Sequence, residues 1–574
     1  MSDHKIPGSE ALIRSLIAEG VDTVFGYPGG SIINVYDRLY DYQDRLRHIL
    51  TRHEQGAIHA AQGFARATGR TGVVFATSGP GATNLVTGIG DALMDSTPLV
   101  VITGQVASSV LGTDAFQEID MVDIANPITK WALQVRRAAD IPSAVARAFF
   151  IANSGRPGPV LLDIAKDAQQ GLMEWSHEKC DYIRTYCDRP ALDYHALSQA
   201  AGIINSAVRP LILSGHGVMI SGAEPQLREL AEKAEIPVAS TLLGLSTLPS
   251  SHPLFRGMLG MHGNIAPNVS TNRADVIIAI GMRFDDRVTG RLDGYAPHAR
   301  IIHIDIDASE FNKNVPVHCT IHGDAREVLT ALLPLVHPAR HPEWLASFDR
   351  LDAIEKTEVI DRQTHPASGP ILMGEVVDQV STATSDDAIL VTDVGQNQML
   401  AARYFRFSSP RSIITSGGLG TMGFSLPAAI GAKIGCPGRQ VCAFAGDGGI
   451  QMTVQELGTI MAYDIPVKII VLNNSFLGNV RQWQELFFNA RYSQTPMTNP
   501  DFVTLASAYG IPGEHITDRA DLPEAITRMV KSPTAYLLEV DIHKTDNIFP
   551  MMPLGAAVDE LMLNATDRLD LSSL

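Results

Sequence analysis

Two polar side chains stand at the ends of two apolar runs, where they could hold a metal ion. One run ends in the letters GDGG at 446–449, and a second ends in the letters NN at 473–474. Apolar runs bounded in this way are typical of buried strands. Since ligands of open parallel sheets lie beyond the carboxyl ends of the strands, Asp447 and Asn474 would face one site. A carboxylate and an amide oxygen suit Mg²⁺, which completes its octahedron with phosphate oxygens and water.

The glycine-rich turn at 446–449 favours an anion beside this metal. Its backbone N–H groups, and the N-terminus of a helix expected over 452–461, attract negative charge. The turn contains neither a G-x-G-x-x-G dinucleotide fingerprint nor a G-K-[ST] phosphate loop. Taken singly, each motif is better explained by a tight turn. Taken together, they indicate a diphosphate held through a metal ion.

The distance between the motifs resembles a known cofactor signature. The letters GDG, then 24 residues, then NN match the thiamine diphosphate pattern of enzymes that decarboxylate or ligate 2-keto acids. Such an enzyme needs a carboxyl group at N1′ of the cofactor's aminopyrimidine, and that group works best partly removed from water. Glu54 opens an alanine-rich helical segment and is the candidate. A glutamate in a first helical turn is otherwise a partner of the helix dipole.

These residues belong to three α/β blocks. Strand-like runs alternate with helical patterns, which predicts doubly wound parallel sheets with crossover helices. The strand, glycine-rich turn and helix of the third block repeat the pattern of residues 73–90 in the first. We expect an N-terminal domain over 1–170, a linker over 171–190, a central domain over 191–345, a linker over 346–369, a C-terminal domain over 370–550 and a tail over 551–574 that lies over the surface or the active site.

Bulk composition excludes several classes of protein. The 574 residues include 45 basic and 62 acidic ones, a net charge of −17, which disfavours nucleic acid and anionic membranes as partners. The five cysteines are too few for a disulfide framework and lack zinc-site spacing; they are Cys180, Cys187, Cys319, Cys436 and Cys442. Neither a signal peptide nor an apolar stretch of about 18 residues is visible. We therefore expect a cytoplasmic protein.

Over nearly its whole length the sequence resembles the large catalytic subunits of acetohydroxyacid synthase, also called acetolactate synthase. The shared motifs, in family order, are VFGYPGG, RHEQGA, ATSGPGATN, GTDAFQE, SGRPGPVLLDI, GMLGMHG, RFDDRVTG, TSGGLGTMGF and RQWQ. The resemblance implies decarboxylation of pyruvate and ligation of the two-carbon unit to a second 2-keto acid. Pyruvate as acceptor gives 2-acetolactate, and 2-oxobutyrate gives 2-aceto-2-hydroxybutyrate, in the first common step of branched-chain amino acid biosynthesis.

The resemblance also implies roles for single residues. Glu54 would serve N1′ across a homodimer interface, and Met422 would bend the cofactor. Asp447, Asn474 and the backbone carbonyl of Phe476 would bind Mg²⁺. Gln117, Phe116 and Lys166 would contact reaction intermediates, Arg287 would hold the acceptor carboxylate, and Trp483 would face its alkyl group. The further residues expected to bind cofactors near the thiamine diphosphate are Tyr27, Gly30, Ser78, Gly79, Val394, Gly395, Gln396, Gly420, Gly446, Gly448 and Gly449.

The central block resembles the family's FAD domain. Gly215 and Gly217 follow a strand, and Asp305 and Asp307 end another, where acidic residues take ribose hydroxyls. The resemblance adds Met261, His262, Gly281, Arg283 and Asp324. In this family FAD performs no net redox step in the main reaction and holds the active site in shape.

Four residues depart from the family pattern, and several alternatives stay open. Asn397 replaces His, Asn479 replaces Met, Ala165 replaces Pro and His216 replaces the middle Gly of a triplet. Rival readings are another thiamine enzyme, such as pyruvate oxidase, oxalyl-CoA decarboxylase, glyoxylate carboligase or the FAD-free acetolactate synthase, and a non-catalytic nucleotide-binding or regulatory homologue. The sequence leaves open dimer against tetramer, acceptor preference, and the effect of a regulatory small subunit.

Overall fold

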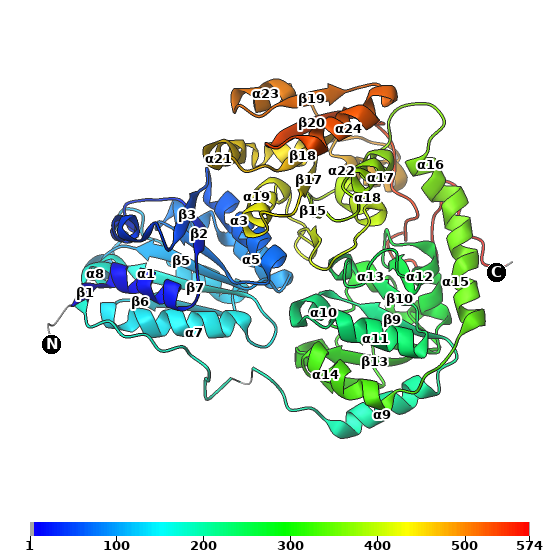
Figure 1. Ribbon diagram of the computed structural model, residues 1–574, viewed down its shortest axis with the longest axis horizontal. Coiled ribbons are helices and arrows are strands. Elements are labelled where there is room, and N and C mark those ends of the chain that lie inside the picture. The colour runs from blue at the N-terminus through cyan, green and yellow to red at the C-terminus, as the bar shows by residue number, and fades with distance from the viewer. Residues whose placement is uncertain (1–4, 187, 573–574) are drawn as a thin grey trace.

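The computed structural model describes residues 5–186 and 188–572 and contains three six-stranded parallel sheets (Figure 1). The N-terminal sheet has the order β3 (Arg47–Leu50), β2 (Thr23–Gly26), β4 (Gly72–Ala76), β5 (Leu99–Gln105), β7 (Pro159–Ala165), β6 (Trp131–Val135). Its helices are α1 (Gly8–Ala18), α2 (Ile33–Leu39), α3 (Glu54–Thr68), α4 (Pro80–Thr83), α5 (Val86–Met94), α6 (Met121–Ala125), α7 (Ile141–Asn153) and α8 (Lys166–Gln170).

The C-terminal sheet has the same topology. Its order is β16 (Ile413–Ile414), β15 (Ile389–Thr392), β17 (Val441–Gly446), β18 (Lys468–Asn473), β20 (Tyr536–Asp541), β19 (Gly513–Ile516). Numbered along the chain within each sheet, both orders read 2-1-3-4-6-5, so the predicted likeness of the outer blocks is confirmed. The helices are α17 (Met373–Ala383), α18 (Gln396–Tyr404), α19 (Ser425–Gly435), α20 (Asp447–Gln451), α21 (Leu457–Tyr463), α22 (Gly478–Phe487), α23 (Phe502–Ala508) and α24 (Leu522–Lys531).

The central sheet differs from both. Its order is β11 (Phe255–Met258), β10 (Val238–Ser240), β9 (Pro210–Ser214), β12 (Val276–Ile280), β13 (Arg300–Asp305), β14 (Cys319–His322). This is the 3-2-1-4-5-6 order of dinucleotide-binding sheets, whose ligands bind where the strand order reverses, here between β9 and β12. The helices are α9 (Tyr194–Asn205), α10 (His216–Ser221), α11 (Glu224–Ala234), α12 (Ile265–Arg273), α13 (Asp286–Thr289), α14 (Ala325–Leu332), α15 (Pro342–Glu355) and α16 (Asp361–Thr364).

Each sheet is buried on both faces, as parallel sheets with crossover helices require. The central strand β12 is wholly apolar and fully buried, and one apolar core lies on either side of it. The N- and C-terminal sheets are likewise enclosed between two cores each. These cores fix the strand ends from which the loops of the site emerge.

The N- and C-terminal domains meet where α3 packs against α19 (Figure 1). At two glycines the backbones of the two helices approach each other so closely that no side chain would fit between them. A Cβ at Gly63 would lie 1.9 Å from the carbonyl oxygen of Ala428, and one at Gly431 would lie 1.7 Å from that of Ala60. The contact therefore fixes α3, and with it Glu54, relative to the C-terminal sheet.

Some segments differ from the sequence-based expectation in detail. The helix expected over 452–461 is broken: α20 begins at Asp447 itself, a 3-10 turn spans Val454–Glu456, and α21 follows. The segment 346–369, expected to be a linker, contains most of α15, a π-helical turn (Lys356–Ile360) and α16. Within 171–190, β8 (Leu172–Met173) pairs with β1 (Ile6–Pro7).

The tail after residue 550 packs on the central domain. Met551, Met552 and Leu561 are buried there in the core beside β12. The backbone N–H of Met552 donates to the carbonyl oxygen of Met261 at 2.8 Å. None of the helices in the described residues combines the length and apolarity needed to cross a bilayer.

Candidate active site

Asp447 and Asn474 lie on one edge of the C-terminal sheet. Strands β17 and β18 are parallel neighbours, with Gly446 paired to Leu472, so both side chains emerge at the same level. Each residue is almost fully buried. The Nδ2 of Asn499 links the two strand ends, because it donates to Asp447 Oδ2 at 2.7 Å and to Asn473 Oδ1 at 3.1 Å.

The chemistry of this edge suits a divalent cation. Burial raises the pKa of Asp447 to about 6, and the hydrogen bond from Asn499 opposes that rise. At neutral pH the carboxylate is therefore ionised. The Oδ1 of Asn474 accepts from the N–H of Phe476 at 3.1 Å, which holds the turn before α22 against the strand end. Hard oxygen donors gathered at one place are the ligand set that Mg²⁺ prefers.

The start of α18 is fixed against the same edge. Gln396 Oε1 accepts from Asn474 Nδ2 at 3.2 Å, while its Nε2 donates to Gln482 Oε1 at 3.0 Å. Gly395, which precedes it, has φ of +134°, a conformation available to glycine. The residues predicted to bind the cofactor after β15 and β17 thus lie in turns at the same edge of the C-terminal sheet.

The residues predicted in the N-terminal domain gather at the carboxyl ends of β2, β4 and β7. Ser78 Oγ lies 2.7 Å from Ser31 Oγ, in the loop that contains Gly30. A Cβ at Gly79 would lie 2.9 Å from the carbonyl oxygen of Gln117, so these two residues touch. Gln117 has φ of +61°, which is uncommon for a side-chain-bearing residue and characteristic of functional loops.

Glu54 opens α3 with its carboxyl group nearly buried. Its Oε2 accepts from Asn84 Nδ2 at 2.9 Å, and among the described residues its Oε1 has no hydrogen-bond partner. Phe116 is 88% exposed, and Lys166 begins α8 directly after β7. Tyr27, after β2, is partly exposed as well.

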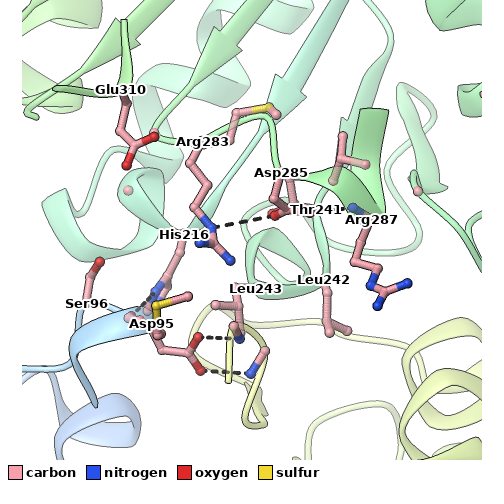
Figure 2. A pocket seen from close by; sticks show the side chains of 18 of the residues that line it. Asp95, Ser96, His216, Thr241, Leu242, Leu243, Arg283, Asp285, Arg287 and Glu310 are labelled. Carbon is pink, nitrogen blue, oxygen red and sulfur yellow. Dashed lines mark hydrogen bonds and ion pairs between the residues drawn. The ribbon is translucent and has the colours of Figure 1, made fainter. Parts of the chain in front are cut away.

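A cavity of about 560 Å³ is lined by all three domains. The central domain contributes the ends of β9, β12 and β13, the N-terminal domain contributes Asp95 and Arg156, and the C-terminal domain contributes the loop 416–420 and α22. Figure 2 shows Asp95 together with His216 and Arg283 of the central domain. Many of the predicted site residues line it, namely Gly217, Met261, His262, Gly281, Arg283, Arg287, Asp305, Asp324, Val394, Gly420 and Trp483.

Close glycine contacts shape the cavity where the strand order reverses. A Cβ at Gly217 would lie 2.6 Å from the Cα of Gly281, and Gly281 itself has φ of +58°. Gly215 packs in the same way against the carbonyl oxygen of Gly281. The absence of side chains lets the backbone after β12 pack directly against the start of α10, as the glycines of dinucleotide-binding sheets do.

Comparison with known proteins agrees with this geometry. Three family models match: "Thiamine pyrophosphate enzyme, N-terminal TPP binding domain" over residues 6–124, the "central domain" over 197–332, and the "C-terminal TPP binding domain" over 393–540. The acetolactate synthase isozyme 2 large subunit of Escherichia coli K12 is 45% identical over 557 residues, covering 97% of this chain and 99% of that protein. The probable acetolactate synthase large subunit of Methanocaldococcus jannaschii is 45% identical over 565 residues, covering 97% and 95%.

The chain belongs to the acetolactate synthase family of thiamine pyrophosphate enzymes. In this family thiamine diphosphate is the cofactor, and the fold predicted from the sequence is confirmed by the matched domains. The sheet edge with Asp447 and Asn474 lies within the matched C-terminal TPP binding domain, and Glu54 lies within the matched N-terminal one. The roles predicted for single residues stay predictions of the acetolactate synthase resemblance.

His216, one of the four residues that differ from the acetolactate synthase family pattern, also lines the cavity. Its Nδ1 lies 3.1 Å from the carbonyl oxygen of Asp95 (Figure 2). Burial lowers the pKa of the imidazole to about 3, so the ring is neutral at physiological pH. The residue therefore adds a neutral polar group and a contact between two domains.

Asp305 and Asp307 take different positions. Asp305 lines the cavity, and burial raises its pKa to about 7. Asp307 does not line the cavity and pairs instead with Arg156 at 3.4 Å. Arg156 also pairs with Glu310 at 2.9 Å, so this ion-pair cluster joins the N-terminal and central domains.

Sequence reasoning missed two buried aspartates that position loops of the site. Asp95 accepts from the N–H groups of Gly417 and Gly418 at 2.8 and 2.7 Å, and it pairs with Arg66 at 3.1 Å (Figure 2). Asp393 accepts from the N–H of Gly423, next to the predicted wedge Met422, at 3.0 Å. Their partners are mostly backbone groups far away in the sequence, which no local pattern reveals.

Proposed function

We propose that this protein is an acetolactate synthase that decarboxylates pyruvate and joins the two-carbon unit to a second 2-keto acid. Pyruvate or 2-oxobutyrate would be the acceptor. The observation that carries the proposal is the shared cavity. Its lining includes Arg287 and Trp483, the residues predicted to bind an acceptor, together with the loop 416–420 of the thiamine pyrophosphate domain. The relatives that match along nearly the full length are named acetolactate synthase.

The donor groups present fit two further cofactors. Asp447, Asn474 and the Phe476 carbonyl supply hard oxygens for Mg²⁺, which would hold the diphosphate. The glycine contacts around Gly281 and the carboxyl group of Asp305 fit a dinucleotide such as FAD in the central cavity. Thiamine diphosphate, when bound, supplies the electron sink for the carbanion chemistry.

The side chains of the protein would bind, orient and exchange protons. Glu54 has a carboxyl oxygen, Oε1, without a partner in the described part of the chain, and there it would hold a proton for the ring nitrogen of the cofactor. The side chain of Arg287 is 60% exposed at the cavity, and among the described residues its guanidinium has only a loose ion pair with Asp286 at 3.7 Å and a weak hydrogen bond to Met261 Sδ at 3.6 Å. It is therefore free to take a carboxylate in bidentate fashion. Trp483 packs with Phe487 and presents an apolar wall.

The overall reaction balances without an oxidant. The C1–C2 bond of the first pyruvate breaks and CO₂ leaves. The electron pair of that bond forms the new carbon–carbon bond to the ketone carbon of the acceptor, and the ketone oxygen takes a proton. No net redox step is needed, which distinguishes this reaction from that of pyruvate oxidase.

We also propose a homodimer with shared active sites, or a tetramer built from it, and a regulatory small subunit. Exposed apolar side chains such as Phe116 and Met452 support a covering partner. The relatives are named large subunits, which supports the small subunit. The four described cysteines are unpaired thiols, in keeping with a reducing cytoplasm.

Product identification tests the proposed function. Purified protein would be incubated with pyruvate, thiamine diphosphate, Mg²⁺ and FAD, and the products would be identified by mass spectrometry. We expect 2-acetolactate. Acetate or acetyl phosphate formed with uptake of O₂ would instead identify a pyruvate oxidase, and the absence of turnover would favour a non-catalytic homologue.

A further inference from the structure

The side chain of Asn479 faces the proposed acceptor site. Asn479 is the second residue of α22, and Trp483 lies four residues later, so both are on the same face of the helix. Both line the central cavity, together with Arg287. The start of α22 is fixed in place, since a Cβ at Gly478 would lie 2.2 Å from Gln396 Oε1.

Among the described residues the carboxamide of Asn479 forms no hydrogen bond, whereas the other inward-facing polar side chains of α22 each form at least one, although Arg481 Nε also lacks a partner. The Oδ1 of Asn479 is buried and has no hydrogen-bond partner among the described residues, and no hydrogen bond of its Nδ2 is found there either. The neighbouring polar side chains all bond within the protein. Arg481 donates to Asp546 and Asn547, Gln482 bonds to Gln396 and Ile548, and Gln484 bonds to Ser493 and Thr495.

A buried amide oxygen without a partner is costly, and proteins satisfy nearly all such groups. In the cavity, the described residues around Asn479 provide no hydrogen-bond partner for its carboxamide. The cavity lining includes the apolar side chains of Trp483, Met261 and Val394, and the guanidinium of Arg287 donates to Met261 Sδ at 3.6 Å rather than to Asn479. The unsatisfied group therefore points to a polar group on the ligand.

We propose that Asn479 is a specificity-determining residue that selects an acceptor 2-keto acid with a hydroxyl group on the carbon next to the ketone. A hydroxyl is both donor and acceptor, so it can serve Oδ1 and Nδ2 of the carboxamide at once. Arg287 would hold the carboxylate at the other end of the acceptor. This inference rests on the proposed carboligation.

The group transfer is the same as with pyruvate as acceptor. Pyruvate loses CO₂, the freed electron pair forms the bond to the ketone carbon of the hydroxylated acceptor, and the ketone oxygen takes a proton. The hydroxyl itself keeps its bonds and serves only for recognition.

A competition between two acceptors of equal size tests the proposal. 3-Hydroxypyruvate and 2-oxobutyrate differ by a hydroxyl in place of a methyl group. The holoenzyme would receive isotopically labelled pyruvate with both acceptors at equal concentration, and the two labelled products would be quantified by mass spectrometry. We expect the product from 3-hydroxypyruvate to exceed the other by about tenfold or more, since sites built for a hydroxyl discriminate strongly against its absence.

Substitution at this position then separates recognition from packing. Asn479→Met and Asn479→Ala should each lower the ratio of hydroxylated to unhydroxylated product by about tenfold. The control Val480→Asn places a carboxamide on an exposed neighbouring position and should leave the ratio unchanged. Equal ratios in the wild type and both Asn479 variants would overturn the proposal.

Two further readouts keep the outcomes distinct. Formation of acetolactate from pyruvate alone by the wild type tests the proposed function itself, so its failure is separate from an unchanged acceptor ratio. FAD affinity, measured by fluorescence titration, tests whether the amide serves the flavin instead. A loss of FAD affinity in Asn479→Met with an unchanged product ratio would overturn the assignment to the acceptor.

Discussion

At the scale of single residues, the candidates for proton transfer are carboxyl groups with one oxygen that has no hydrogen-bond partner among the described residues. Glu54 is the clearest case, because Asn84 occupies Oε2 and leaves Oε1 without a partner among the described residues. The helix dipole at the start of α3 accounts for a negative charge at this position. It does not account for the burial of the side chain, which a proton-transfer role does.

Glu54→Gln should lower turnover by about 10²–10⁴-fold, because an amide cannot hold or release the proton. The shape of the side chain is retained, so folding and diphosphate binding should persist. Steady-state kinetics and titration of thiamine diphosphate measure the two effects separately. Near-normal turnover in the variant would remove Glu54 from its proposed role.

Trp483 is the second residue with a measurable consequence. Trp483→Leu should open the apolar wall of the cavity and erode any preference for 2-oxobutyrate over pyruvate as acceptor. The two acceptors differ by one methylene, worth roughly 1–3 kcal/mol in an apolar pocket. The product ratio in a mixture of both acceptors measures the effect, with Trp483→Phe as the conservative control. A ratio unchanged in Trp483→Leu would leave this side chain a packing role only.

At the scale of elements, the site is built from loops that follow parallel strands and from glycines that allow backbones to meet. Gly281→Ala should reduce FAD affinity by about tenfold or more, because the new Cβ would lie 2.5 Å from the Cα of Gly217 and the position has positive φ. Flavin fluorescence titration measures this. Gly222→Ala is the matched control: it shares the positive φ but has open space around it, and it should keep its FAD affinity.

A buried ion pair connects α18 to the central domain. Arg403 pairs with Glu355 at 2.5 Å with both side chains inaccessible, and it donates to the carbonyl oxygens of His262 and Gly263. Arg403→Met leaves the Glu355 charge buried and uncompensated, which should cost about 3–5 kcal/mol of stability. Chemical denaturation measures the loss.

The neighbouring residue Arg406 provides the control for that measurement. Its ion pairs with Asp378 and Asp386 are partly exposed, so Arg406→Met should cost about 1 kcal/mol or less. Equal destabilisation by Arg403→Met and Arg406→Met would contradict the interpretation of the buried pair as a link between domains.

Much of this architecture could be predicted from the sequence, and the failures have a physical cause. Strand β12 has the predicted bounds Val276–Ile280, because a continuous apolar run between polar residues leaves little ambiguity. The helix expected over 452–461 is broken, because Thr453 bonds to the carbonyl oxygen of Gly423, far away in the chain. Asp95, Asp393 and the Arg156 cluster were missed for the same reason: long-range partners are invisible to local patterns.

At the scale of the whole molecule, the two outer sheets have the same strand order. The predicted residues divide between them, with Glu54 in the N-terminal domain and Asp447 in the C-terminal domain. If Glu54 of one protomer serves the diphosphate of its partner, two inactive variants should complement each other. A mixed dimer of Glu54→Gln and Asp447→Ala then contains one site with both residues intact.

Refolding or co-expressing these two variants together should restore about a quarter of the wild-type activity, since half of the dimers are mixed and one of their two sites is complete. Each variant alone should be nearly inactive, Asp447→Ala because the metal loses its charged ligand. An absence of recovery in the mixture would contradict sites shared between protomers and would favour a site completed within one chain.

The stoichiometry of pyruvate turnover distinguishes carboligation from simple decarboxylation. Uniformly ¹³C-labelled pyruvate would be followed by NMR with the holoenzyme in the absence of other acceptors. Carboligation predicts that two molecules of pyruvate disappear for each CO₂ released and that one five-carbon product carrying five labelled carbons appears. One CO₂ for each pyruvate, with acetaldehyde or acetate as the product, would contradict the account.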